Sequence, residues 1–141
     1  MPVTAMHKLD GFVSVTQVID YFAEPTLVDW KIDTGRREAG RISRLTAKTG
    51  TRVHDLIFKD WNDRGYKLVK ADNTEVKSCM EAWERFKADY KPEIEIMELE
   101  VKNEARGVVG HIDMLVGISS NRVILDIKTA GSIRQKHWLQ L

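Results

Sequence analysis

The stretch Ile124-Leu125-Asp126-Ile127-Lys128-Thr129 decides the fold class, because charged residues here interrupt a segment that otherwise has the composition of a buried strand. Two earlier stretches, Glu98-Leu99-Glu100-Val101 and Gly110-His111-Ile112-Asp113, have the same character. Carboxylates are disfavoured in strands, and burying them without a partner costs free energy. Several carboxylates that meet on one sheet need a compensating cation, most simply a divalent metal. The pattern therefore points to a metal-dependent nuclease.

After Pro92 the hydrophobic period changes from helical to alternating. Because side chains alternate across a strand, Asp126 and Lys128 are expected to project from the same face. Glu98 and Glu100 also share a face, and alternation alone does not separate them as site residues. The alternation predicts three strands, at 93–101, 108–118 and 122–129. A tight turn at 119–121 joins the last two.

Apolar residues before the strands recur at helical spacing. Ser14 and Gln17 are expected to form a capping box for the first helix. Pro25 interrupts that helix, and Thr26 caps the next one. Gly50 is a candidate kink or break in the third helix. The predicted helices lie at about 15–23, after Thr26, and at about 39–64 and 74–90.

With 141 residues and 43% hydrophobic content, the chain is expected to form one domain. The net charge of +1 means that nucleic-acid binding must come from local clusters of Lys and Arg. Cys79 is the only cysteine, which excludes an iron–sulfur cluster and an intrachain disulfide. The sequence carries no secretion signal or membrane-spanning run, so we expect a soluble protein in the cytoplasm of a bacterium or phage-infected cell, with no membrane partner.

The charged residues of the strands fit phosphodiester hydrolysis. Carboxylate oxygens are preferred by Mg²⁺ or Mn²⁺, and Asp113 and Asp126 on neighbouring strands can share one ion. Lys128 would then orient the attacking water, lower its pKa or neutralise charge in the transition state. The alternative for an Asp-x-Lys sequence is a solvated ion pair on an exposed face. The flanking apolar residues and the second aspartate favour the catalytic site.

These motifs, Glu98, then 110–113, then 126–129, resemble the PD-(D/E)xK nuclease superfamily and, within it, the RecB-like exonuclease branch. The segments 12–16 and 50–54 also resemble sequences of this branch, namely those of phage exonucleases and the mitochondrial genome-maintenance exonuclease. The resemblance implies an α/β fold with a restriction-endonuclease-like core, in which helices flank a small mixed sheet. It implies one nuclease domain over 1–141, with three parts: helices in 12–91, a catalytic sheet in 93–129 and the start of the following helix in 132–141.

The resemblance also implies a role for each motif residue and Mg²⁺ or Mn²⁺ as the cofactor. By resemblance, Lys128 is the catalytic lysine, and Glu98 is an acidic residue that approaches the metal. Gln140 is similar to the glutamine of a Gln-x-x-x-Tyr motif on the helix that follows, and the tyrosine would lie beyond Leu141. Because the predicted three-stranded sheet is followed by a helix that stops part-way, we expect that the chain is a fragment or that a final strand lies beyond it. The implied metal ligands are Asp113, Asp126, the Ile127 carbonyl and His54.

Basic residues follow one another at steps of three or four in the third predicted helix. They would form a basic stripe that runs toward His54 and binds DNA phosphates, or else a solvated helix face. His54 itself would otherwise be a core or capping histidine, and His111 shares a strand face with Asp113 and is a further candidate contact. Trp30, Tyr66 and Trp138 either stack on unpaired bases or belong to the core. The residues of this basic stripe are Arg37, Arg41, Arg44, Lys48 and Arg52.

The predicted function is a divalent-metal-dependent DNA exonuclease that prefers single-stranded ends and acts in phage replication, recombination or DNA repair. One alternative is a structure-specific endonuclease for branched or flapped DNA. Another is a nuclease-like module that binds DNA without cutting it. A hydrolase of a different phosphoester would have no use for the basic stripe.

Overall fold

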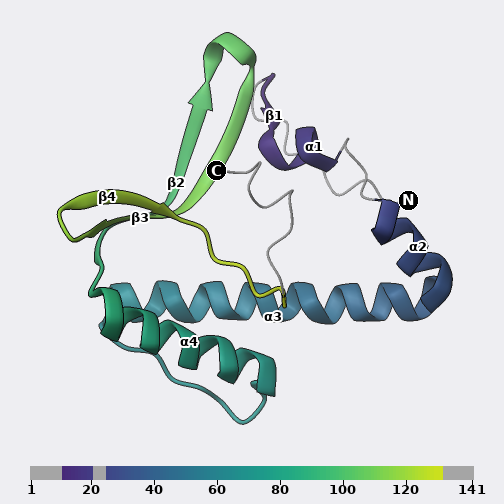
Figure 1. Cartoon of the computed structure of the whole chain (residues 1–141), viewed down its shortest axis with the longest axis horizontal. Helices are drawn as coiled ribbons and strands as arrows, with labels where there is room; N and C mark the ends of the chain where they lie inside the picture. Colours follow the sequence, from purple (N-terminus) through teal and green to yellow (C-terminus); the bar gives the residue numbers. More distant parts are fainter. Residues whose placement is uncertain (1–10, 21–24, 132–141) are drawn as a thin grey trace.

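The computed structural model describes residues 11–20 and 25–131, and it shows a mixed α/β fold (Figure 1). The strands lie on one side of the long helix α3 in this view, and α4 lies on the other side. The prediction of a small mixed sheet with helices is confirmed. The elements in chain order are β1 (Val13–Ser14), α1 (Val15–Asp20), α2 (Pro25–Thr34), α3 (Arg36–Asp63), α4 (Thr74–Tyr90), β2 (Glu93–Asn103), the 3-10 turn Glu104–Arg106, β3 (Val108–Ile118) and β4 (Asn121–Leu125).

Strand β3 is the centre of the sheet, and its two edges differ. Strand β2 pairs antiparallel with one edge from end to end. The other edge is shared, because β1 pairs parallel with residues 108–109 and β4 pairs antiparallel with residues 114–118. Between these two partners, residues 110–113 have no strand beside them on that edge within the described part of the chain. This opening is where the candidate site lies.

The predicted third strand was wrong beyond Leu125. The ladder between β3 and β4 ends with the pair Met114 and Leu125. Two residues after Leu125, the Ile127 N–H donates to the Asp113 carboxylate (Oδ2, 2.6 Å) and not to a carbonyl of β3. A side chain thus replaces the backbone partner, and the segment after β4 leaves the sheet. The segment after β4 passes close to Gly50 of α3: a Cβ built on this glycine would lie 3.5 Å from Thr129 Oγ1.

Several helix predictions are confirmed, and two boundaries are corrected. The capping box of α1 is present, since the Ser14 and Gln17 backbone N–H groups each donate to the other's side chain at 3.1 Å. Helix α3 runs unbroken through Gly50 and starts three residues before the prediction, after a turn at Gly35 with φ +83°. Pro25 is the first residue of α2, where its fixed φ is favourable and its missing N–H is not needed, so Thr26 lies within this helix and is not its cap as predicted.

The core joins α3, α4 and β3. Trp83 of α4 donates its indole N–H to Asp60 of α3 at 2.8 Å, which satisfies the one polar group of a buried aromatic side chain. Tyr66 packs against this core. The structure therefore supports its predicted place in the core and not a role in stacking on unpaired bases. The buried cluster consists of Val53, Leu56, Ile57, Val76, Met80, Trp83, Met114 and Val116.

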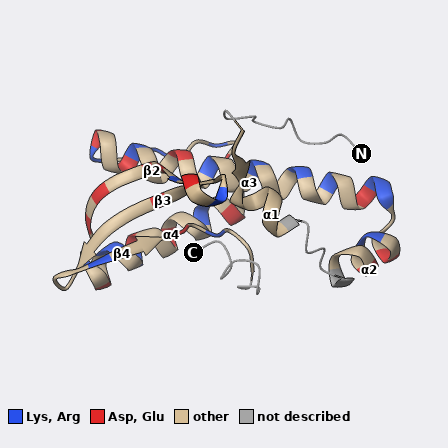
Figure 2. Cartoon of the chain, turned by 90° about the horizontal axis from the view of Figure 1, so that it is seen from above, with Lys and Arg blue, Asp and Glu red and all other residues tan. Residues whose placement is uncertain are grey.

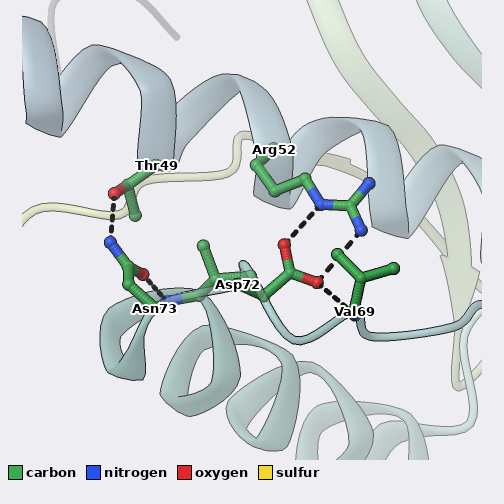
Figure 3. Close-up of polar contacts among 6 residues, drawn as sticks. Thr49, Arg52, Val69, Asp72 and Asn73 are labelled. Carbon is green, nitrogen blue, oxygen red and sulfur yellow. Dashed lines mark hydrogen bonds and ion pairs between the residues drawn. The ribbon is translucent and has the colours of Figure 1, made fainter.

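Asp72, in the loop between α3 and α4, anchors this loop to α3 (Figure 3). Its side chain is only 5% exposed and accepts two hydrogen bonds from Arg52, at 2.7 and 3.0 Å, and one from the Val69 N–H at 2.7 Å. The next residue, Asn73, caps α4 and donates to Thr49 of α3 at 3.3 Å. The hydrogen bonds from Arg52 and Val69 lower the pKa of Asp72 from 3.8 to about 2.

We expect Asp72→Asn to lower stability at neutral pH. Because the pKa of Asp72 is depressed by folding, its contribution is present above about pH 3.8 and is lost as the pH falls toward about 2. The urea midpoint of the variant should therefore lie below that of the wild type at pH 7, and the difference should shrink through this window. Asp89→Asn, at an exposed position of α4, is the control and should leave the midpoint unchanged. A difference that is constant with pH would contradict this account.

Candidate functional site

Two carboxylates follow the last pair of the β3–β4 ladder. Met114 and Leu125 form that pair; Asp113 is the neighbouring residue of β3, and Asp126 is the first residue after β4. Their side chains are 22% and 20% exposed, and both line one cavity of about 460 Å³. The structure thus brings together the two aspartates that the sequence predicts as metal ligands.

Lys128 lies at the same cavity, beside Asp126. Its Nζ is 2.6 Å from Asp126 Oδ2, although neither residue belongs to β4. Asp113 holds the segment between them in place by accepting the Ile127 N–H at 2.6 Å. An ammonium and two carboxylates therefore face one hollow, with the main chain of 126–128 fixed by one of those carboxylates.

His54 reaches this cluster from helix α3. Its Nε2 lies 3.3 Å from the Ile127 carbonyl oxygen and 3.9 Å from Asp113 Oδ2. The ring contributes either an N–H donor to the carbonyl or a lone pair beside it, since either nitrogen can carry the proton. His54 is partly buried and lies near Asp113 and the Ile127 carbonyl, but it is not among the residues that line the cavity, so its predicted role as a metal ligand stays a prediction.

The donors at the cluster fit a hard divalent cation better than zinc. Within residues 11–20 and 25–131, no three or more His, Cys, Asp or Glu side chains are grouped closely enough to hold a metal ion. A closed structural zinc site needs four such ligands, whereas Mg²⁺ is usually bound through one or two carboxylates together with water and substrate phosphate. For such an ion, Asp113 and Asp126 would supply the carboxylates, and the Ile127 carbonyl would supply a third oxygen. Each carboxylate retains acceptor capacity beyond the hydrogen bond or ion pair described.

The structure does not bring Glu98 to the cavity. Its neighbours on β2 pair with Ile112 and Met114 of β3, which places Glu98 opposite Asp113 in the register. However, its backbone has φ +52°, in the left-handed region that non-glycine residues rarely adopt, and the side chain is exposed. Glu98 is not among the residues that line the cavity.

Glu100 has partners of its own. Lys102 Nζ lies 3.0 Å from Glu100 Oε1, and His111 Nε2 lies 3.4 Å from Oε2. The hydrogen bond from Lys102 holds the pKa of the Glu100 carboxyl below its usual value. His111 lines the cavity, so Glu100 is linked to the site through this histidine.

Lys and Arg are spread along α3 (Figure 2), but the basic stripe forms only in part. Arg37, Arg44 and Lys48 are exposed on α3, as predicted. Arg41 is paired with Glu38 at 2.6 Å on the surface, and the Arg52 guanidinium is bound by Asp72. Arg52 is therefore a structural residue, which corrects its predicted role as a phosphate contact.

The predicted direction of the basic stripe was also wrong. Arg52 contacts the loop before α4, whereas His54 contacts the Ile127 segment on another side of α3. Residues two apart in an α-helix are separated by about 200° around its axis, so a stripe that ends at Arg52 cannot continue to His54. Phosphates bound by the exposed members of the stripe would lie on a different face of α3 from His54.

Sequence reasoning missed one wall of the cavity. The wall is formed by the β1–α1 junction, with Ser14, Val15 and Thr16. The sequence signal for it was Gly110, because a glycine inside a strand often marks the close approach of a ligand or of another backbone. The predicted residues Gln140 and Trp138, and the predicted start of a helix at 132–141, lie outside the described residues.

No helix in residues 11–20 or 25–131 is long and apolar enough to cross a membrane. No protein-family model matches the chain, and no curated protein matches it. Its relation to the PD-(D/E)xK nucleases is therefore a prediction that rests on the motif residues.

Proposed function

We propose that this chain is a divalent-metal-dependent deoxyribonuclease with a restriction-endonuclease-like core, acting as an exonuclease on single-stranded DNA ends. One observation carries the proposal: Asp113, Asp126 and Lys128 converge on one cavity at the open edge of β3. A solvated ion pair would need only Asp126 and Lys128. The second carboxylate at the next ladder position, and a histidine from α3 beside it, favour a site that handles a phosphate and a cation.

Asp113, Asp126 and the Ile127 carbonyl are the residues that would hold Mg²⁺ or Mn²⁺, with His54 beside them. When bound, the ion neutralises negative charge on the scissile phosphate. The Lys128 ammonium donates hydrogen bonds to the attacking water or to a phosphate oxygen, and Asp126 at 2.6 Å fixes its position. Asp113 keeps the 126–128 segment against β3 through the Ile127 N–H. An in-line attack of water on the phosphorus predicts inversion of configuration.

The proposal is tested with end-labelled single-stranded and duplex DNA of one sequence, incubated with Mg²⁺, Mn²⁺ or EDTA. We expect stepwise shortening of the single strand with either metal and none in EDTA. A circular single strand should stay intact, because an exonuclease needs an end. Asp126→Asn, purified in the same way, controls for a contaminating nuclease. Equal cleavage by both proteins would reject the assigned site, and cutting of the circle would indicate an endonuclease.

A module that binds DNA without cutting it is the second candidate. The observation in its favour is that the described residues lack a group of three His, Cys, Asp or Glu side chains close enough to hold a metal. Metal-independent DNA binding without hydrolysis under all three conditions would support this candidate. Both candidates use the exposed part of the basic stripe to bind phosphates.

We expect replacement of Arg44 and Lys48 by Gln to weaken single-strand binding in EDTA. Each phosphate contact contributes about 0.7 to the slope of log K against log salt for single strands, so the slope should fall by about 1.4. Fluorescence anisotropy at several salt concentrations measures both quantities. A matched change of Lys67 and Lys70, two exposed lysines in the loop after α3, should have a smaller effect. Unchanged binding in the first variant would identify the stripe as a solvated helix face.

A further inference from the structure

The cavity does not end at the carboxylates. It continues along the open edge of β3, past residues 110–113, to the β1–α1 junction. Four strand residues span roughly 13 Å, at about 3.3 Å per residue. Figure 1 shows β1 and β4 at different ends of the sheet, with this stretch of β3 between them. The cavity is therefore elongated, with the charged cluster at one end and the first turn of α1 at the other.

The two ends of the cavity differ in chemistry. The end near α1 is lined by Val15, Val101 and Val109, and His111 lies between this end and the aspartates. Gly110 lets Val15 pack closely over β3 at this wall of the cavity, because a Cβ there would stand 3.1 Å from Val15 Cγ2 and 3.9 Å from Val101 Cγ2. The volume of about 460 Å³ lies within the roughly 300–1,000 Å³ typical of small-molecule sites.

We propose that the valine-lined end of the cavity binds the nucleoside next to the scissile phosphate, as an unpaired terminal nucleotide. This inference rests on the proposed function, since the phosphate would lie at Lys128 and the aspartates. The apolar side chains suit the faces of the base and the sugar. The edge of β3 at 110–113, which has no strand partner in the described part of the chain, offers backbone hydrogen bonds to the polar edges of the base. A base enclosed by these walls must leave its stack and its pair, which accounts for a preference for single-stranded ends.

The test compares three ligands by titration calorimetry in the presence of Mg²⁺: dAMP, deoxyribose 5-phosphate and inorganic phosphate. All three offer a phosphate to the charged cluster, and only dAMP also offers a base. We expect dAMP to bind at least tenfold more tightly than inorganic phosphate. Val101→Trp, at a 40% exposed position on the cavity wall, should remove this advantage by filling the hollow. Ile96→Trp is the matched control on the same strand, 36% exposed and away from the cavity lining, and should retain the advantage.

Thermal unfolding of both variants shows whether they remain folded. Equal binding of dAMP and inorganic phosphate by the wild type would overturn the nucleoside site and leave the proposed nuclease function standing. Retention of the full dAMP advantage by folded Val101→Trp would overturn it as well. If none of the three ligands binds and the wild type cleaves no DNA, the proposed function itself fails, and this inference fails with it.

Discussion

Lys128→Ala is expected to lower the rate of DNA hydrolysis by about 10²–10³-fold, because one preorganised donor to developing charge typically contributes that factor. The side chain lies at the cavity with its Nζ 2.6 Å from Asp126 Oδ2, so among the residues that the structure describes its removal takes the one lysine from the cavity lining. The loss should appear in kcat more than in KM, since the effect is on the transition state. The measurement is the initial rate of shortening of an end-labelled single strand at saturating Mg²⁺.

The chain contains its own matched control for this variant. Glu100 and Lys102 have the same acid-x-Lys spacing as Asp126 and Lys128, and they form a similar ion pair at 3.0 Å. Lys102 does not line the cavity, so Lys102→Ala removes a comparable ion pair while Glu100 keeps its contact with His111 of the lining. We expect its rate to stay close to that of the wild type. Equal rates for Lys128→Ala and Lys102→Ala would show that Lys128 has no special part in the reaction.

Asp113→Asn should abolish the stabilisation of the protein by divalent metal and lower hydrolysis by at least about 10²-fold. Asparagine can still accept the Ile127 N–H, so the 126–128 segment keeps its anchor while the negative charge is lost. A bound ion stabilises only the folded state, by about 2.7 kcal/mol at a free concentration of 100 times Kd. The thermal midpoint of the wild type should therefore rise with Mg²⁺, and that of the variant should not.

The control for this experiment is Glu95→Gln, which removes an exposed carboxylate of β2 that is paired with Arg122 at 2.6 Å. This variant should keep the full response to Mg²⁺, because its carboxylate lies outside the cavity lining. If Asp113→Asn still gains stability from Mg²⁺, Asp113 is not a metal ligand. Asp113→Ala provides a further comparison, since it also removes the acceptor for Ile127 and should lower stability without metal.

Local patterns in the sequence predicted much of the fold. The bounds of β3 and α4 and the capping box of α1 follow from periodicity and from residues three or four apart, so each can be read within one window of chain. The acid-x-Lys spacing likewise placed Asp126 beside Lys128. Such features depend on residues that are close in the sequence, and they are present unchanged in the tertiary structure.

The site depends on contacts between segments that are distant in the sequence, and local patterns in the sequence did not predict these contacts. The Asp113 carboxylate takes the Ile127 N–H and ends β4 early, and β1 pairs with the far end of the same edge, which leaves the cavity between them. Asp72, which lies 20 residues further along the chain, likewise binds the Arg52 guanidinium, so Arg52 is not a free member of the basic stripe. Periodicity and spacing determined most of the helices, strands β2 and β3, and the identity of the charged groups. Which carboxylates meet, and which cation each one binds, was decided only by packing in three dimensions, because hydrogen bonds and ion pairs form with whatever partner the fold brings within about 3 Å.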